Sequence, residues 1–219
     1  IARARSRKAF ADVADLAHRA QLDRHDLQAL ARAGALRPLA GGNRRAALWQ
    51  AAAAVPDRDL LRGTARDDAD PALPLPTEGQ AISADYRALG LTLGRHPVAL
   101  LRDRLQADHL QSAAQLAGLR NRQLARACGL VTVRQRPQTA KGVVFMTLED
   151  ETGPVNVILW PDIFKKYRRE ALDAPLLAVY GIWQTDGRVH HLVARRLADR
   201  SALLAQALSG LQTPSRDFC

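Results

Sequence analysis

The chain has 219 residues, of which 47% are hydrophobic and 25% are charged. This composition is typical of folded globular proteins and excludes wholesale disorder. Lys and Arg number 32 against 22 Asp and Glu, which gives a formal net charge of +10. Only four of the basic residues are Lys, and Arg forms bidentate contacts with phosphate groups. The charge therefore favours a polyanionic partner such as a nucleic acid, with an Arg- and Ala-rich genome as the alternative explanation.

The sequence lacks the signals of membrane and secreted proteins. No stretch approaches the roughly 18 consecutive apolar residues of a membrane span, and no secretory segment is visible, so we expect a cytoplasmic protein without membrane contact. The two cysteines, Cys128 and Cys219, are too few for a structural zinc site or a disulfide framework. The chain begins at Ile1 and its only methionine is Met146, which predicts a processed or partial chain.

The N-terminal part has the apolar spacing of short helices. Residues 10–20 place apolar side chains at helical intervals, and Asp23 and Asn43 are candidate N-caps for a second and a third helix. Gly34 follows the second helix, where a left-handed C-cap is expected. Residues 32–36, Arg-Ala-Gly-Ala-Leu, resemble the core of a helix-hairpin-helix module, a structure that binds DNA phosphates.

We predict a helix-hairpin-helix-like lobe over residues 1–62, with Arg44 and Arg45 as candidate phosphate ligands. A small helical bundle with a solvated basic face is the alternative. A Pro- and Asp-rich linker is predicted at 63–80, because proline and low apolar content disfavour packing, and a helical connector at 81–127. Two basic regions flank a slightly acidic one, with net charges of +7 over residues 1–66, −2 over 67–120 and +5 over 121–219.

No arrangement of residues predicts an active site in this chain. His96 precedes a proline and is interpreted as a helix cap, since no second His, Cys or paired carboxylate lies near it in the sequence. Asp150 and Glu151 fall in a predicted turn. The sequence contains no phosphate-binding loop, dinucleotide fingerprint or nucleophile elbow. We therefore predict no catalytic residue, metal site or cofactor within these residues.

From residue 128 the hydrophobic period changes from that of a helix to that of a strand. The predicted elements are strands at 128–136, 143–148 and 155–160, a helix at 161–172, and strands at 176–184 and 188–196, the last two joined by an Asp-Gly hairpin turn. Three strands, a helix and two strands follow one another in the order of the OB-fold. The predicted fold class is α+β with several domains: the all-α lobe, the linker and connector, a five-stranded OB-fold barrel at 128–200 and a tail at 201–219.

OB-folds bind single-stranded nucleic acid on the face around their second and third strands, with the loops between strands one and two and strands four and five closing over it. Phe145 alternates with Val144 and Met146, and the sequence leaves open which parity is buried. Trp160 and Tyr180 are expected in the core. Strand four supplies Trp183 as a further aromatic candidate, and the basic helix residues Lys165, Lys166, Arg168 and Arg169 are interpreted as solvated, with phosphate contact as the alternative. The candidate nucleic-acid-binding residues of the barrel are Arg134, Arg136, Lys141, Phe145, Thr147, Arg188 and His190.

Residues 142–161, GVVFMTLEDETGPVNVILWP, resemble the OB-fold of bacterial C-family DNA polymerase alpha subunits. Four further segments are similar to the error-prone, damage-induced branch of that family: Arg44–Trp49, Asp85–Leu93, His96–Val98 and Ser215–Phe218. The resemblance extends over nearly the whole chain and covers the C-terminal region of such polymerases, a helix-hairpin-helix region followed by an OB-fold.

The resemblance implies that the parent is a DNA-directed DNA polymerase of translesion synthesis and DNA repair. It implies DNA as partner, both the single-stranded template and the primer–template duplex, together with accessory translesion proteins and, through them, the sliding clamp. It also implies Mg²⁺ for the parent, although the catalytic aspartates of the family match nothing in this chain. A bacterial cytoplasmic, nucleoid-associated location is expected.

Two alternatives stay open at this point. Residues 145–150 have the pattern Phe-x-x-Leu-x-Asp, which is also similar to the RNA-binding OB-folds of tRNA-anticodon type. The barrel could instead be a protein-interaction scaffold whose charge is incidental.

Overall fold

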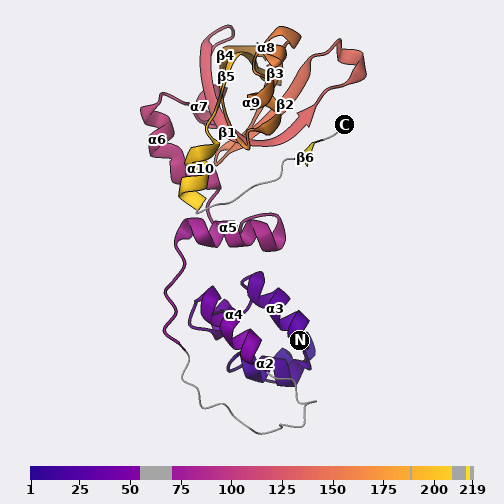
Figure 1. The fold of residues 1–219 in the computed structure, drawn as a ribbon, viewed down its shortest axis with the longest axis vertical. Coiled ribbons are helices and arrows are strands. Elements are labelled where there is room, and N and C mark those ends of the chain that lie inside the picture. The colour runs from indigo at the N-terminus through magenta and orange to yellow at the C-terminus, as the bar shows by residue number, and fades with distance from the viewer. Residues whose placement is uncertain (55–70, 188, 209–215, 218–219) are drawn as a thin grey trace. The chain divides into compact units, whose positions relative to one another are not determined.

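The computed structural model describes residues 1–54, 71–187 and 189–208, and the backbone of 216–217. The chain divides into two compact units, residues 1–93 and 94–219 (Figure 1). The division falls inside the segment 81–127 that we predicted as a connector, so its first helix belongs to the N-terminal unit. The first part of the predicted linker, 63–70, lies outside the described residues.

The first unit is helical, as predicted. Its elements are α1 (Ala2–Arg7), α2 (Val13–Ala20), α3 (Arg24–Arg32), η1 (Arg37–Leu39), α4 (Arg44–Ala53) and α5 (Glu78–Leu89). The predicted caps are confirmed, because the side chains of Asp23 and Asn43 accept backbone N–H groups at the starts of α3 and α4. Gly34 has a φ of +76°, the left-handed conformation expected after α3. Apolar residues of α2, α3 and α4 form the core of this unit, among them Leu16, Leu27 and Ala47.

The second unit begins with helical turns and continues into a barrel. Its elements are η2 (Pro97–Leu101), α6 (Arg102–Ala107), α7 (Ala113–Ala117), β1 (Leu124–Gln135), η3 (Gln138–Ala140), β2 (Val144–Asp150), β3 (Gly153–Leu159), α8 (Pro161–Lys166), α9 (Arg168–Asp173), β4 (Leu176–Asp186), β5 (Val189–Asp199), α10 (Ser201–Leu208) and β6 (Arg216–Asp217). His96 caps η2 as predicted, since its Nδ1 accepts the N–H of Val98 at 3.2 Å. The predicted helix at 161–172 is two short helices that meet at Tyr167.

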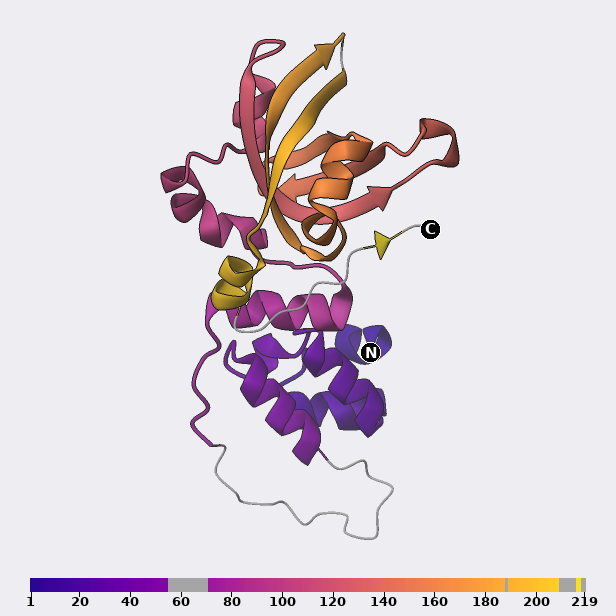
Figure 2. The ribbon, with the colours of Figure 1, turned by 45° about the horizontal axis from the view of Figure 1, so that its top comes forward.

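The five main strands close into a barrel, which confirms the OB-fold prediction. β1 pairs with both β2 and β4, β2 pairs with β3, β4 pairs with β5, and a parallel pairing of β3 with β5 completes the circle (Figure 2). Along the chain, α8 and α9 follow β3 and precede β4. Gly181 lies where β4 approaches β5, and a Cβ atom there would lie 2.0 Å from the carbonyl oxygen of Val193, so only glycine fits.

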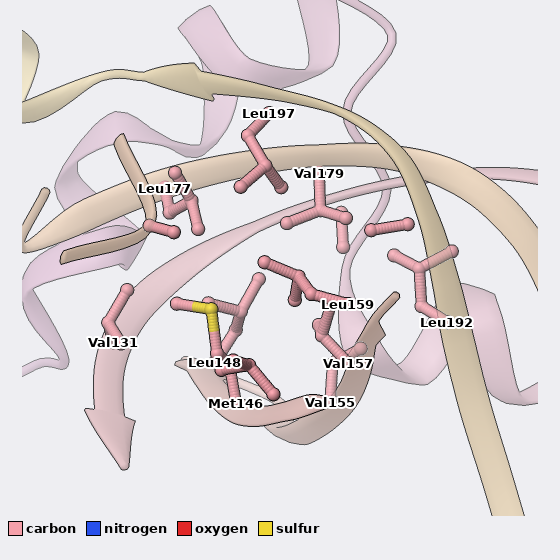
Figure 3. Packing of buried hydrophobic residues seen from close by; sticks show 14 of the residues in the cluster. Val131, Met146, Leu148, Val155, Val157, Leu159, Leu177, Val179, Leu192 and Leu197 are labelled. Atoms are coloured by element: carbon pink, nitrogen blue, oxygen red, sulfur yellow. The ribbon is translucent and has the colours of Figure 1, made fainter. Parts of the chain in front are cut away.

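One parity of β1, β2, β3 and β4 fills the barrel interior, and β5 contributes Leu192, Ala194 and Leu197 across a shift in its register (Figure 3). Met146 and Leu148 of β2 and Val157 of β3 point inward, where they pack with apolar residues of β4 and β5. Since successive side chains of a strand alternate between faces, Phe145 and Thr147 lie on the outside. The structure thereby answers the question of parity that the sequence left open.

Candidate nucleic-acid interface

The candidate binding surface is the outer face of the sheet formed by β1, β2 and β3. Phe145 lies opposite Gln135 of β1 and Ile158 of β3, and both Phe145 and Ile158 are half-buried. Thr147, two residues further along β2, lies opposite Asn156, and its Oγ1 is 3.5 Å from Asn156 Oδ1. The face therefore combines an apolar patch suited to stacking with polar groups that can bind bases.

Trp160 extends this face at the end of β3. Val157 and Leu159 point into the barrel, so Ile158 and Trp160 alternate outward. Trp160 is 54% exposed and stands at the N-cap of α8. The expectation that Trp160 lies in the core is wrong, because Pro161 starts the helix directly after the strand and leaves the indole outside.

Sequence reasoning missed two residues of this surface, Asn156 and Ile158. The signal that could have found them is the alternation of β3, in which the apolar residues at 155, 157 and 159 occupy one face. The intervening side chains must then share the other face with those of β2.

Arg134 was predicted to contact nucleic acid, and the structure places it elsewhere. Its side chain is only 7% exposed. The Nε atom donates to the carbonyl oxygen of Ala171 at 2.8 Å, and Nη2 donates to that of Ala174 at 2.7 Å. These hydrogen bonds join β1 to the end of α9 and occupy the guanidinium. The candidate role of Arg134 is therefore corrected from phosphate ligand to structural tie.

Arg136 and Lys141 lie on the loop between β1 and β2, and both are exposed. The guanidinium carbon of Arg136 lies 5.6 Å from the centroid of the Phe164 ring in α8. Lys141 adopts a left-handed φ of +49°. This loop and the hairpin between β4 and β5 both project from the barrel in Figure 2. Arg136 and Lys141 thus keep their cationic groups exposed on this loop.

The hairpin of β4 and β5 contributes less than the sequence suggested. Trp183 is 4% exposed and belongs to the core, where its ring stacks on His190 with centroids 5.8 Å apart. His190 itself is half-buried. Tyr180 is also half-buried and lies beneath the guanidinium of Arg196, whose carbon is 5.3 Å from the ring centroid. The candidate Arg188 lies outside the described residues.

In the helical unit, Arg44 and Arg45 hold the structure together. Arg44 is 7% exposed and forms an ion pair with Asp85 of α5. It also donates to the carbonyl oxygen of Ala81 in α5 at 3.1 Å. Arg45 donates to the carbonyl oxygen of Pro74 at 3.1 Å and to Gln80 Oε1 at 2.9 Å. The prediction of a phosphate ligand is corrected for Arg44, which is buried, and Arg45 is engaged within the unit.

Two carboxylates and a thiol of the barrel unit are engaged within the fold. Asp150 accepts from the N–H of Thr152 at 2.7 Å and so closes the turn between β2 and β3. Burial opposes ionisation of Glu151, yet the hydrogen bond from Arg102, at 2.9 Å, lowers the pKa of Glu151 below its ordinary value. Burial raises the pKa of the Cys128 thiol to about 12, so this thiol stays protonated at neutral pH.

Metal-ligand clusters and membrane-spanning helices are both absent from the part of the chain that the structure describes. Nowhere in that part do three His, Cys, Asp or Glu side chains gather in a way that could hold a metal ion. None of its helices combines the length and the apolar character that a membrane crossing needs.

Two family models match the chain, and together with the fold they define its class. Residues 125–199 match the family described as OB-fold nucleic acid binding domain. Residues 1–47 match the helix-hairpin-helix motif. The closed five-stranded barrel and the helical unit described above agree with these two models, an OB-fold of the nucleic acid binding family preceded by a helix-hairpin-helix motif.

The particular relatives are error-prone DNA polymerases. The chain is 58% identical over 220 residues to the one from Bordetella parapertussis, 58% identical over 219 residues to the one from Burkholderia pseudomallei, and 50% identical over 218 residues to the one from Aromatoleum aromaticum. All of this chain is covered, but it spans only 20–21% of the length of these relatives. The resemblance to the error-prone branch of bacterial DNA polymerases is thereby confirmed for this region.

Among solved structures, an asparaginyl-tRNA synthetase from Pyrococcus horikoshii is 19% identical, with a TM-score of 0.30 over 36% of this chain and 20% of that one. A likeness of this size supports no statement about function.

Proposed function

We propose that this chain is the non-catalytic DNA-binding part of an error-prone DNA-directed DNA polymerase, in which the OB-fold holds the single-stranded template. The observation that carries the proposal is the outer face of β2 and β3, where Phe145, Ile158 and Trp160 share one parity. The exposed cations Arg136 and Lys141 lie on the adjoining loop. Bases would stack on the aromatic rings while the cations contact phosphates.

We further propose that the helical unit contacts the primer–template duplex. The helix-hairpin-helix match over residues 1–47 supports this role. Because Arg44 and Arg45 are engaged within the unit, the phosphate contacts would come from exposed arginines, of which Arg24 and Arg32 lie at the two ends of α3.

The role of the whole protein rests on its relatives. We infer translesion synthesis in DNA repair in the bacterial cytoplasm, at the nucleoid, with accessory translesion proteins as partners and the sliding clamp as an indirect one. Such a polymerase uses Mg²⁺, but the described residues hold no cluster of ligands that would fit this ion. No step proposed for this chain therefore involves the metal.

Fluorescence anisotropy of the full chain with a labelled single-stranded DNA of about 12 nucleotides, within the site sizes of OB-folds, tests the proposal. The logarithm of the affinity should fall linearly with the logarithm of the salt concentration, with a slope of about −0.7 for each phosphate neutralised. Phe145→Ala should weaken binding about tenfold, since stacking contributes roughly 1–3 kcal/mol for each base. Leu91→Ala, at an exposed leucine of the helical unit, is the matched control.

Absence of binding by the unaltered chain at low salt would refute the proposal and favour a protein-docking role for the barrel. Tighter binding of an RNA of the same sequence would instead favour the anticodon-type alternative.

A further inference from the structure

We propose that Trp160, Arg136 and Arg168 form a nucleotide subsite that receives one base and its phosphate where a single DNA strand passes from the β2–β3 face to α8. The inference rests on the proposed function and adds to it a site on the helical side of the barrel. The base would stack on the indole of Trp160, and the two guanidinium groups would share the phosphate.

Trp160 occupies the junction of the sheet face and the helix. Trp160 has the same parity as Ile158, and Ile158 is the strand partner of Phe145. The three side chains therefore lie on the same outer surface. The carbonyl oxygen of Trp160 accepts the N–H of Phe164 at 2.9 Å, which starts the first turn of α8. More than half of the side chain is exposed. An indole in this position offers a stacking surface that the core does not use.

Two guanidinium groups from different elements each lie near the ring of Phe164. Arg136 comes from the loop after β1 and Arg168 from α9, and the guanidinium carbon of each lies 5.6 Å from the ring centroid. Cation–π attraction orients both groups. Phe164 belongs to α8 and Arg168 to α9, and the carboxylates of these two helices are those of Asp162, Glu170 and Asp173.

Neither Arg136 nor Arg168 forms an ion pair with a carboxylate among the described residues. Both positive charges therefore lack a carboxylate partner among the described residues. A phosphate, which arginine binds through a planar fork of N–H donors, would supply that counter-charge.

The loop between β1 and β2 brings the base platform and the cations together. A Cβ atom built at Gly142 would lie 3.6 Å from Cγ of Pro161, the residue after Trp160, and 3.7 Å from Nη2 of Arg136. The backbone at Gly142 therefore lies close to both the start of α8 and the Arg136 guanidinium. A nucleotide stacked on Trp160 would carry its phosphate toward that guanidinium.

The first test measures tryptophan fluorescence in the full chain. Trp49 and Trp160 are each 54% exposed, whereas Trp183 is 4% exposed. In the variant Trp49→Phe, quenching on addition of single-stranded DNA therefore reports on Trp160, and we expect it to saturate together with the anisotropy signal. Quenching should be absent with the double variant Trp49→Phe/Trp160→Phe.

The second test separates base from phosphate. Trp160→Ala should weaken binding of a normal oligonucleotide about tenfold, but should cause no further loss with an abasic strand of the same length. Arg168→Gln should weaken binding of both strands about fivefold and make the salt slope less steep by about 0.7, the share of one phosphate contact. Trp49→Ala and Arg195→Gln, at an equally exposed Trp and an exposed Arg of β5, are the matched controls.

The outcomes distinguish the subsite from the proposed function. If Phe145→Ala weakens binding while Trp160→Ala and Arg168→Gln behave like their controls, the subsite is refuted, and single-strand binding by the barrel through Phe145 stands. If the unaltered chain binds no single-stranded DNA, both are refuted. Equal losses from Trp160→Ala on normal and abasic strands would also overturn the subsite, because a stacking platform requires a base.

Discussion

The substitution Arg134→Met separates structural arginines from binding arginines in this barrel. Methionine keeps most of the aliphatic stem but removes the donors that contact the carbonyl oxygens of Ala171 and Ala174 at 2.8 and 2.7 Å. Those carbonyls lie at the C-terminal end of α9, where no further helical turn supplies N–H partners. Arg134 is buried, so water does not readily replace the lost donors.

The expected loss of stability follows from these contacts. Leaving a buried acceptor without a partner costs about 1–3 kcal/mol, so two acceptors give about 2–6 kcal/mol. Methionine avoids the desolvation of a buried guanidinium, which brings the estimate to the lower part of this range, about 2–4 kcal/mol. For a unit of this size the midpoint of thermal unfolding should fall by about 10 °C.

Thermal unfolding monitored by circular dichroism measures this effect, with anisotropy on single-stranded DNA as the second readout. Arg136→Met is the control, since the exposed Arg136 should affect binding and leave the midpoint within about 2 °C. An unchanged midpoint for Arg134→Met, together with a loss of affinity equal to that of Arg136→Met, would show that Arg134 is a phosphate ligand after all.

Three further predictions concern packing, a buried ion pair and pH. Gly181→Ala should prevent normal pairing of β4 with β5 and destabilise the barrel by about 3 kcal/mol or more, as urea unfolding would show, because the new Cβ would lie 2.0 Å from the carbonyl oxygen of Val193. Arg44→Met should destabilise the helical unit by about 3–5 kcal/mol in the same assay, since it leaves Asp85 buried without its partner. Burial lowers the pKa of His96 against the opposing effect of nearby carboxylates, so the stability that it contributes is present above its unfolded pKa of about 6.5 and declines as the pH falls below that value.

Each of these predictions has a control. Gly118→Ala should be tolerated, because its nearest neighbour is 3.6 Å away and its φ is negative. The double variant Arg44→Met/Asp85→Leu should recover part of the stability lost with Arg44→Met, and no recovery would contradict the ion-pair argument. His96→Asn keeps a side-chain cap but removes the titrating imidazole, so it should flatten the dependence of stability on pH below about 6.5. An equally steep dependence in that variant would assign it to another group.

The sequence predicted the order of the barrel strands because their apolar residues follow a period of two, most clearly in β2 and β3. It could not give the parity of β2, since Phe145 on the outside is as apolar as Met146 on the inside. The same ambiguity misplaced Trp160, because an indole next to a buried strand is usually a core residue. Trp160 is exposed because α8 starts directly after it, at Pro161. A pattern of hydrophobicity does not show where β3 ends and the helix begins.

The arginines show a second limit of the sequence. Arg19 donates to the carbonyls of Ala4 and Lys8, both at 2.7 Å, Arg102 pairs with an acidic turn, and Arg134 donates to the end of α9. These partners lie between 11 and 49 residues away along the chain, so no short sequence motif identifies them. The guanidinium fork is suited both to gathering carbonyls and to binding phosphates. The net charge of +10 includes both kinds of arginine. Only the arginines that form no contacts within the fold are available to phosphates. The salt dependence of DNA binding should therefore be shallower than the net charge suggests.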